Sequence, residues 1–406
     1  MILSVGLDLG SWIVQGQRPV KQGAVHGWDL GIVDRTREYM RMGDSDYLSQ
    51  RGYATAQFAK GVREPVVVYR TQMEYAWTGY TYVIGAFYAL FDFSPVAVKG
   101  INCLLGALLG SCIFFLAKAC IDVGSARWAC ILVTFFPSLV LWSATNLKEP
   151  SLVLLTALLL WLFVKIRQAQ GLKAVAFYGS LFACALFAHM TLRSPIYSLS
   201  LVGCLLIATG LRWIRKGWQV LLLVGGLVGL VWVRSADVQG ILASAFLKHI
   251  GHFWTPGVSY RYLPDELYMP EYFRQWVSSG TMGLAFALKA ITQATFHYLV
   301  EPLPSRMDNL FSLVVYPQMM FWYFSLPLGF LGIAWSLRRN FHRSFFLVLV
   351  VWVWLVIGGL TGGNVGTAFR VRDMITPFFL IFACAGARGL AFGPTALGAV
   401  SRRDPP

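Results

Sequence analysis

The residues best suited to chemistry in this chain are two carboxylates in the sequence Gly43-Asp44-Ser45-Asp46-Tyr47. A carboxylate within hydrogen-bond reach of an acceptor hydroxyl takes up its proton and acts as a general base. Asp46 is the first choice for this role and Asp44 the second, with Tyr47 in a supporting position. The same sequence is also ordinary turn chemistry, and a DxD pair binds a divalent cation through oxygen ligands in other settings. Both alternatives stay open at this point.

Three further polar clusters stand at the ends of apolar segments. WSATNLKEP contains Lys148 and Glu149, HMTLRSP contains Arg193, and FRVRD contains Arg370 and Arg372. If FRVRD enters its span in an extended conformation, its two arginines project on one side and form a fork for a phosphate. Each cluster also has a simpler interpretation as a polar turn, a snorkelling side chain or an interfacial anchor.

Composition decides the kind of protein that must position these residues. Of 406 residues, 57% are hydrophobic and 13% are charged, and the mean hydropathy is +0.59. Soluble chains carry about 25% charged residues, so this chain cannot cover a water-facing surface. The sequence predicts an all-α polytopic protein, a single membrane domain over 1–406 with about ten transmembrane helices. The predicted spans are a short, weak one in 1–14, then 97–117, 127–143, 150–166, 174–190, 195–211, 218–233, 315–336, 344–360 and 374–392.

Charge between the spans predicts their orientation. Short connections rich in lysine and arginine stay on the cytoplasmic side, which places both termini there and the long connections 17–96 and 234–314 outside. Two apolar stretches in those connections, 74–93 and 281–300, are expected to lie in the outer interface. The net charge of +15 is therefore mostly an orientation signal, and it does not indicate a nucleic-acid partner.

Signatures for other chemistry are missing from the sequence. It contains no P-loop, GxGxxG, HExxH or DxDxDG motif, which would indicate nucleotide or metal binding. The seven cysteines fall in or beside apolar stretches without metal-like spacing, so we interpret them as small buried hydrophobic residues. These observations direct attention to the outer connections.

Four segments, taken in order, resemble the GT-C superfamily of membrane glycosyltransferases. They are GDSDYLSQRGYATAQFAKG, LFDFSPVAVKGINCLLGALLG, FFPSLVLWSATNLKEP and FRVRDMITPFFLIFACAGARGL. The likeness is to the bacterial branch related to protein O-mannosyltransferases and aminoarabinose transferases, over roughly 40–215 and 295–392. In this resemblance Lys99 takes a basic position and Glu149 an acidic one, whereas Asp92 stands where that group usually has a glycine.

The resemblance implies transfer of a sugar from a polyprenyl-phosphate donor to an acceptor at the outer face of a bacterial plasma membrane. The acceptor would be a lipid, a glycan or a protein. Asp46 would be the base of an inverting displacement, and the donor phosphate would meet the cations listed here: Lys148, Arg193, Arg370 and Arg372. No cofactor or metal is required by such a step, although a divalent cation stays an alternative. Membrane lipids are implied as neighbours, and nucleic acid is not.

Two other classes of function compete with this one. A transporter, a flippase or an oligosaccharide polymerase would also handle lipid-linked molecules, and a non-enzymatic membrane subunit would use the large outer connections to bind a partner. Transporters usually carry charges at mid-membrane and repeat internally. The uncharged span centres and the lack of evident internal symmetry count against transport, whereas a polymerase stays open.

Overall fold

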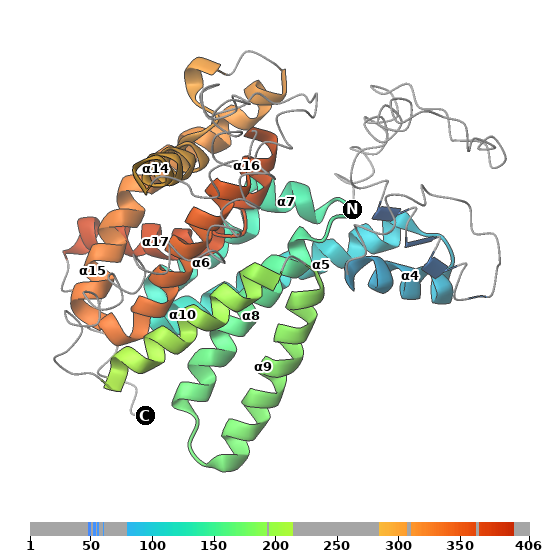
Figure 1. Ribbon diagram of the computed structural model, residues 1–406, viewed down its shortest axis with the longest axis horizontal. Coiled ribbons are helices and arrows are strands. Elements are labelled where there is room, and N and C mark those ends of the chain that lie inside the picture. Colours follow the sequence, from blue (N-terminus) through green and yellow to red (C-terminus); the bar gives the residue numbers. More distant parts are fainter. Residues whose placement is uncertain are drawn as a thin grey trace. The chain divides into compact units, whose positions relative to one another are not determined.

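The computed structural model describes residues 48–49, 52–53, 55–56, 60, 79–192, 195–213, 284–306, 310–362 and 365–393. Within these ranges every regular element is a helix (Figure 1), which confirms the predicted all-α class. The elements are α4 (Gly79–Phe91), α5 (Pro95–Cys120), α6 (Val123–Phe135), α7 (Pro137–Ser143), α8 (Glu149–Gln168), α9 (Leu172–Leu192), α10 (Pro195–Trp213), α14 (Leu284–Val300), the 3-10 turn η2 (Pro304–Arg306), α15 (Leu310–Thr361), α16 (Val365–Arg372) and α17 (Thr376–Phe392).

Five helices in the described part of the chain are long and apolar enough to cross a membrane, which makes this a multi-pass membrane protein. They correspond to predicted spans and cover Pro95–Cys120, Glu149–Gln168, Leu172–Leu192, Val315–Arg339 and Phe341–Thr361. Two bent helix pairs raise the number to as many as seven. The predicted spans in 1–14 and 218–233 lie outside the described residues, so the expected total of about ten stays a prediction.

Proline explains where several helices begin and bend. Pro95, Pro137 and Pro195 are the first residues of their helices, where the missing N–H group costs no intrahelical hydrogen bond. Pro137 also divides the predicted span 127–143 into α6 and α7, which are bent by 53°. The last predicted span corresponds to α17, which forms a second bent pair with the preceding helix α16, at 66°.

The long element α15 contains a reversal of the chain. The Ser344 hydroxyl donates a hydrogen bond to the Ser336 carbonyl at 3.1 Å. In a straight helix, residues eight positions apart are separated by about 12 Å along the axis. The chain therefore folds back here, as the predicted basic connection between the spans 315–336 and 344–360 requires. Arg338 and Arg339 lie at this reversal.

The chain divides into two compact units: Met1–Cys112 with Cys130–Ser198, and Ile113–Ala129 with Leu199–Pro406. In the first unit, α8 and α9 lie side by side, while α4 contacts α9 and α7 contacts α8 (Figure 1). Most of α8 is buried, whereas α9 exposes large apolar side chains such as Phe177 and Phe187. Such exposure is stable against lipid tails and unfavourable in water.

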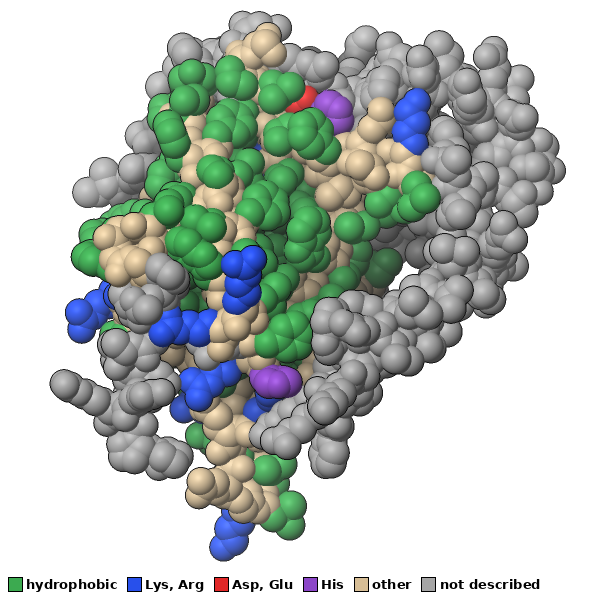
Figure 2. All heavy atoms as spheres, turned by 90° about the vertical axis from the view of Figure 1, so that its left-hand side faces the viewer, with side chains coloured by type: hydrophobic (Ala, Val, Ile, Leu, Met, Phe, Trp, Pro, Cys, Tyr) green, Lys and Arg blue, Asp and Glu red, His purple; other side chains and the backbone are tan. Residues whose placement is uncertain are grey.

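In the second unit, α17 packs along α15, and both helices contribute buried apolar side chains to the core. Gly332 and Gly386 allow their close approach, because a Cβ on Gly332 would collide with the Phe382 carbonyl and one on Gly386 with the Leu328 carbonyl. Small residues at helix crossings are typical of membrane bundles. Figure 2 shows one face of the molecule, on which hydrophobic side chains cover most of the described surface.

The first interfacial prediction falls partly on α4. This helix has 13 residues, which is fewer than the roughly 20 needed to cross the hydrocarbon region, and it exposes Val83, Leu90 and Phe91. The second prediction, 281–300, contains the apolar helix α14. Their depth in a membrane stays a prediction, as does the outward direction of the long connections.

Candidate functional site

A polar turn of the first unit joins α7 to α8 and carries residues of WSATNLKEP. Asn146 and Glu149 are buried, with 1% and 3% of their surface exposed, and Lys148 is half-buried. Glu149 is the first residue of α8, where the helix dipole favours a negative charge. We call residues 144–149 the LKEP turn, after the sequence Leu147-Lys148-Glu149-Pro150 at which it runs into α8.

Asn102 of α5 holds this turn from inside the bundle. Its side-chain nitrogen donates to the carbonyl oxygens of Thr145 at 2.7 Å and Leu147 at 3.0 Å, and to the hydroxyl of Tyr80 at 2.8 Å. Burial raises the pKa of the Tyr80 phenol well above its ordinary value, so the group stays neutral. The contacts that Asn102 makes with the turn and with Tyr80 are thus hydrogen bonds between neutral groups.

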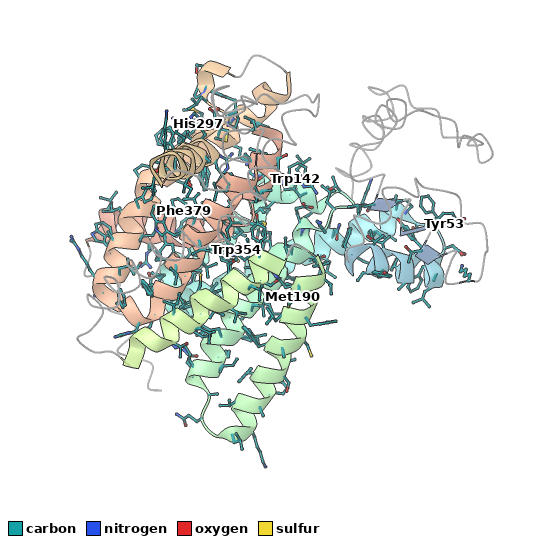
Figure 3. All side chains as sticks on the ribbon, in the orientation of Figure 1. Tyr53, Trp142, Met190, His297, Trp354 and Phe379 are labelled. Carbon is teal, nitrogen blue, oxygen red and sulfur yellow. The ribbon has the colours of Figure 1, made fainter. Side chains whose placement is uncertain are left out.

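The segment that follows the acidic motif meets the same turn. Asn146 donates a hydrogen bond to the hydroxyl of Ser49, which is itself buried. A Cβ on Gly52 would collide with Ile84 of α4, and Figure 3 shows Tyr53 beside this helix. Ser49 stands three residues after Asp46 in the sequence, so the connection 17–96 reaches the LKEP turn shortly after its carboxylate pair.

Lys99, the basic residue of the family-like segment, is almost fully buried, with 4% exposed. It precedes Asn102 by three residues on α5, so the two side chains share one face of the helix. Asp92, the other residue noted in that segment, has a φ of 60°. This left-handed conformation favours glycine and is tolerated by aspartate, which explains why the departure from the usual glycine is compatible with the turn.

His189, which the sequence places beside Arg193, has a structural environment. Its ring is buried and contacts Thr156 at 3.2 Å and Ser198 at 2.7 Å. Thr156 donates its own hydrogen to the Leu152 carbonyl, so Nε2 of His189 carries the ring hydrogen and Nδ1 accepts one from Ser198. The imidazole thus connects three helices.

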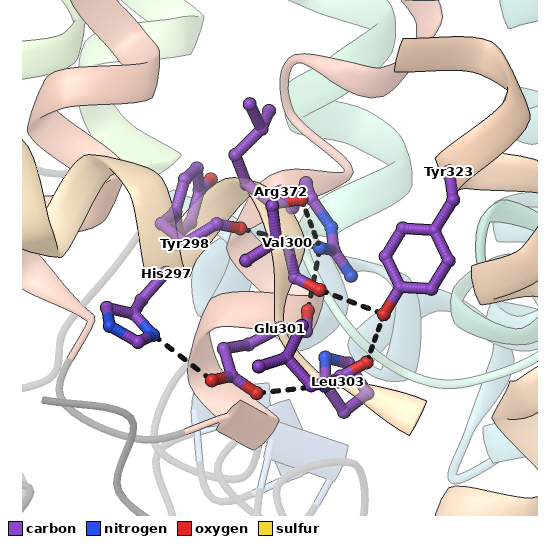
Figure 4. Close-up of polar contacts among 9 residues, drawn as sticks. His297, Tyr298, Val300, Glu301, Leu303, Tyr323 and Arg372 are labelled. Atoms are coloured by element: carbon purple, nitrogen blue, oxygen red, sulfur yellow. Dashed lines mark hydrogen bonds and ion pairs between the residues drawn. The ribbon is translucent and has the colours of Figure 1, made fainter. Parts of the chain in front are cut away.

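In the second unit, Arg372 lies at the end of α16 with 3% of its surface exposed. Figure 4 shows its guanidinium against the last turn of α14, where Nη1 donates to the carbonyls of Leu299 at 3.1 Å and Glu301 at 2.7 Å. The rings of Trp322 and Phe369 lie 5.4 Å from the guanidinium carbon, in cation–π range. Arg372 caps a helix end whose carbonyls have no intrahelical partner.

The carboxylate of Glu301 orders the same helix end from the other side. It is fully buried and accepts a hydrogen bond from the backbone N–H of Leu303 at 2.9 Å, and it contacts Nδ1 of His297 at 3.1 Å. The Tyr323 hydroxyl lies within hydrogen-bond distance of the carbonyls of Val300 and Pro302 (Figure 4). We call residues 297–303 with Arg372 and Tyr323 the arginine clasp.

One expectation from the sequence is wrong. Arg370 and Arg372 do not approach the last span in an extended conformation, because residues 365–372 form α16. Side chains two positions apart on a helix point in nearly opposite directions. Arg372 is buried in the clasp and Arg370 is half-buried, so they do not form a fork for one phosphate.

Four of the predicted site residues fall outside the described part of the chain. Asp44, Asp46, Tyr47 and Arg193 lie outside the described residues, and their roles stay predictions. Of the described predicted residues, Lys148 and Glu149 are neighbours in the LKEP turn, while Arg370 and Arg372 lie on α16. Among the described residues there is no group of three or more histidine, cysteine or acidic side chains that could hold a metal ion.

Asn102 and Glu301 are the polar residues that sequence reasoning missed. Asn102 carried a usable signal, because an amide inside an apolar span is costly and is usually paired with a specific partner. Glu301 carried a weaker one, as the acidic residue at the end of an apolar segment and just before two prolines. Neither pattern identifies the partners: the carbonyls to which Asn102 donates, or the Leu303 N–H group from which Glu301 accepts.

The comparisons with known proteins bear on this site. The family model of dolichyl-phosphate-mannose-protein mannosyltransferases matches residues 78–234, which include the LKEP turn, Asn102 and Lys99. That segment also lies largely within the part of the chain for which the sequence resembles the GT-C superfamily. No curated protein matches the chain.

Two solved structures resemble the model, both of ArnT from Cupriavidus metallidurans. The apo form matches with 12% identity and a TM-score of 0.46, covering 94% of this chain and 59% of that one. The form bound to undecaprenyl phosphate matches with 13% identity and a TM-score of 0.45, covering 95% and 59%. The chain thus spans about three fifths of the length of the ArnT chain in both structures.

Proposed function

We propose that the chain transfers a sugar from a polyprenyl-phosphate-linked donor to an acceptor hydroxyl at the outer face of the membrane. The observation that carries this proposal is the LKEP turn. It presents Lys148 and Glu149 together, is contacted by Ser49 just after the carboxylate pair, and lies inside the segment matched by a family of lipid-phosphate sugar transferases. The mannosyltransferase family description names a sugar linked to a lipid phosphate, which is the donor class we assign.

The phosphate of such a donor meets a cation at the turn. A polyprenyl tail holds the donor in the bilayer, and its phosphate lies at headgroup depth. Lys148 is half-buried at the end of a span, where a long cationic side chain reaches that depth. Fixed positive charge stabilises the additional negative charge that develops on a departing phosphate. Arg193 and Arg370 stay predicted phosphate contacts from the sequence, while the guanidinium of Arg372 is engaged by backbone carbonyls.

The carboxylate pair supplies the base. In the proposed step the acceptor oxygen attacks the anomeric carbon, and the bond from that carbon to the phosphate oxygen breaks. The acceptor proton passes to Asp46, with Asp44 as the alternative base and Tyr47 beside it, and polyprenyl phosphate leaves with both bonding electrons. This single displacement inverts the anomeric centre. A phosphate is a stable leaving group, so the step requires no metal, although a divalent cation bound by the pair is compatible with it.

The setting follows from the orientation of the spans. We place the protein in a bacterial plasma membrane with both termini in the cytoplasm and the LKEP turn outside, as the basic connections indicate. The acceptor is then a lipid, a glycan or a protein that reaches the outer surface. Glu149 is buried in the first turn of α8 and supports the cation beside it.

The experiment uses the full chain in vesicles with radiolabelled polyprenyl-phosphate mannose or polyprenyl-phosphate aminoarabinose, and a bacterial envelope extract as acceptor. Release of polyprenyl phosphate and labelling of the extract are measured together. We expect transfer by the wild-type chain and loss of at least 100-fold in Asp46→Asn, which is the scale of general-base catalysis. Asp92→Asn is the matched control, because Asp92 is an exposed acid of the same unit and should retain transfer.

Two results would overturn the proposal. One is wild-type vesicles that release no polyprenyl phosphate from either donor. The other is a double variant, Asp44→Asn with Asp46→Asn, that transfers as fast as the wild type.

A further inference from the structure

Asn102 makes an unusual set of contacts for one side chain within a span. Its amide nitrogen lies within 3.0 Å of three oxygens, two of them backbone carbonyls of the LKEP turn. An amide nitrogen carries two hydrogens, so three acceptors share two donors, and the nitrogen is fully engaged. The residue is 1% exposed, which removes water as a substitute donor.

The two carbonyls need this donor because of their place in the chain. Helix α7 ends at Ser143 and α8 begins at Glu149, so Thr145 and Leu147 lie between helices. A buried carbonyl without a donor costs about 1–3 kcal/mol. The amide of Asn102 therefore selects one conformation of the turn, in which both carbonyls point toward α5.

Neighbouring residues of α5 reinforce the same contact. The Cys103 thiol donates to the Ser143 carbonyl at 3.3 Å. One turn further along the helix, a Cβ on Gly106 would collide with the Ser143 side chain. One face of α5 is thus fitted to the end of α7 and to the turn that follows it, and Asn102 is its polar contact.

We infer that Asn102 is a positioning residue for sugar transfer: by holding the carbonyls of Thr145 and Leu147 it sets where Lys148 and Glu149 stand. This rests on the proposed function, in which Lys148 meets the donor phosphate and Glu149 supports that cation. Asn102 itself touches neither donor nor acceptor. Its effect passes through the backbone of the turn, and misplacement of a catalytic group by about 1 Å lowers a rate by as much as about 100-fold.

The test compares three substitutions in the full chain. Asn102→Asp keeps the volume and removes both donors, Asn102→Leu removes all polarity, and Asn102→Gln keeps the amide on a longer side chain. We expect the kcat of Asp and Leu variants to fall about 10- to 100-fold, with the KM for the lipid-phosphate sugar changed less than about threefold. The Gln variant should recover at least several-fold of the lost kcat. If the Leu variant does not fold, the Asp and Gln pair still decides the question.

The matched control is Thr156→Val. Thr156 is also fully buried, and its hydroxyl also contacts a backbone carbonyl and a second side chain, but on α8 away from the turn. This variant should lose stability to a similar degree while keeping its kcat. An equal fall of kcat in Thr156→Val and Asn102→Asp would reduce Asn102 to a general structural residue and overturn the inference.

Amide hydrogen exchange separates this inference from the proposed function. The peptide that covers 143–149 should exchange faster in Asn102→Asp than in the wild type, while peptides of α9 exchange as before. Unchanged exchange of the turn would overturn the inference even if the chain transfers sugar. Faster exchange in a chain that shows no transfer would leave the positioning of the turn supported and would remove the proposed function.

Discussion

The LKEP turn and the arginine clasp solve one structural problem with opposite chemistry. Both are helix ends with backbone carbonyls that need donors in a dry environment. The turn is held by the neutral amide of Asn102, whereas the clasp is held by the charged guanidinium of Arg372. In the clasp the cation is therefore part of the fold. In the turn a neutral amide donates to the carbonyls, and in our proposal Lys148 of the same turn meets the donor phosphate.

This comparison makes the number of cations a poor guide to function. FRVRD looks the richer phosphate site in sequence, because it offers two arginines and the turn offers one lysine. In the structure one of these two arginines, Arg372, is 3% exposed and lies against carbonyls and aromatic rings. The difference between the two clusters is which group donates hydrogen bonds to the backbone carbonyls of the helix end.

The largest effect should follow from removing the charge of the clasp. Arg372→Leu leaves the carbonyls of Leu299 and Glu301 buried without their donor, and we expect a loss of about 3–5 kcal/mol in the free energy of unfolding. Denaturation of the purified chain in detergent micelles measures it. Arg370→Leu, on the half-buried neighbour, is the control and should change unfolding by less than about 1 kcal/mol. Equal losses in the two variants would contradict the clasp.

The next effect concerns the cation of the turn and should appear in activity. Lys148→Gln removes a charge from a half-buried side chain, so we expect transfer to fall about 10- to 100-fold, as for loss of a group that stabilises developing charge. Its unfolding midpoint should stay near that of the wild type. Steady-state rates and a denaturation curve on the same preparation check both parts. A large loss of stability with normal transfer would show that Lys148, like Arg372, belongs to the fold.

A smaller effect should follow from removing one neutral member of the clasp. Tyr323→Phe deletes the hydroxyl that bridges the Val300 and Pro302 carbonyls and keeps the ring. We expect a loss of about 1–2 kcal/mol in the free energy of unfolding, which is clearly less than for Arg372→Leu. Tyr316→Phe, on the same helix, serves as the control. A loss as large as that of Arg372→Leu would show that the hydroxyl, and not the guanidinium, dominates the clasp.

The smallest effect concerns the turn between α4 and α5. Asp92 has a φ of 60° and makes an exposed ion pair with Lys60 at 3.2 Å, and such pairs contribute little. Asp92→Gly should therefore be neutral or stabilising by up to about 1 kcal/mol, whereas Asp92→Ala should destabilise by about 1 kcal/mol. Thermal unfolding of both variants measures the difference. The reverse order would show that the ion pair outweighs the backbone conformation.

Sequence patterns predicted the helices better than they predicted the site. Hydropathy over windows of about 20 residues located α5, α8, α9 and the two halves of α15, because lipid requires long apolar segments. The same pattern cannot see that residues 365–372 form a helix bent by 66° from α17. The spacing of the two arginines in FRVRD puts them on one side only if the segment is extended. Whether the segment is extended or helical depends on its backbone conformation. Asp92, noted in the sequence only as a departure from the group's usual glycine, has a left-handed φ of 60° that the sequence did not predict.

The roles of Asn102 and Glu301 could not be predicted for a related reason. Their partners are backbone carbonyls 43 and more residues away or a neighbouring N–H group, and every residue type offers these groups equally. A sequence shows which side chains can donate or accept a hydrogen bond, but not which backbone group each of them meets. Tertiary packing of α5 against the LKEP turn is needed to bring them together.

One measurement tests the central claim, that a lipid phosphate binds at the LKEP turn and not at the arginine clasp. A polyprenyl phosphate with a photoreactive group beside the phosphate is incorporated with the full chain into vesicles and irradiated, and labelled peptides are identified by mass spectrometry. We expect label on the peptide that covers 142–149, and its loss when unlabelled undecaprenyl phosphate competes. Competed label on the peptide that covers 297–303, with none on the turn, would contradict this account.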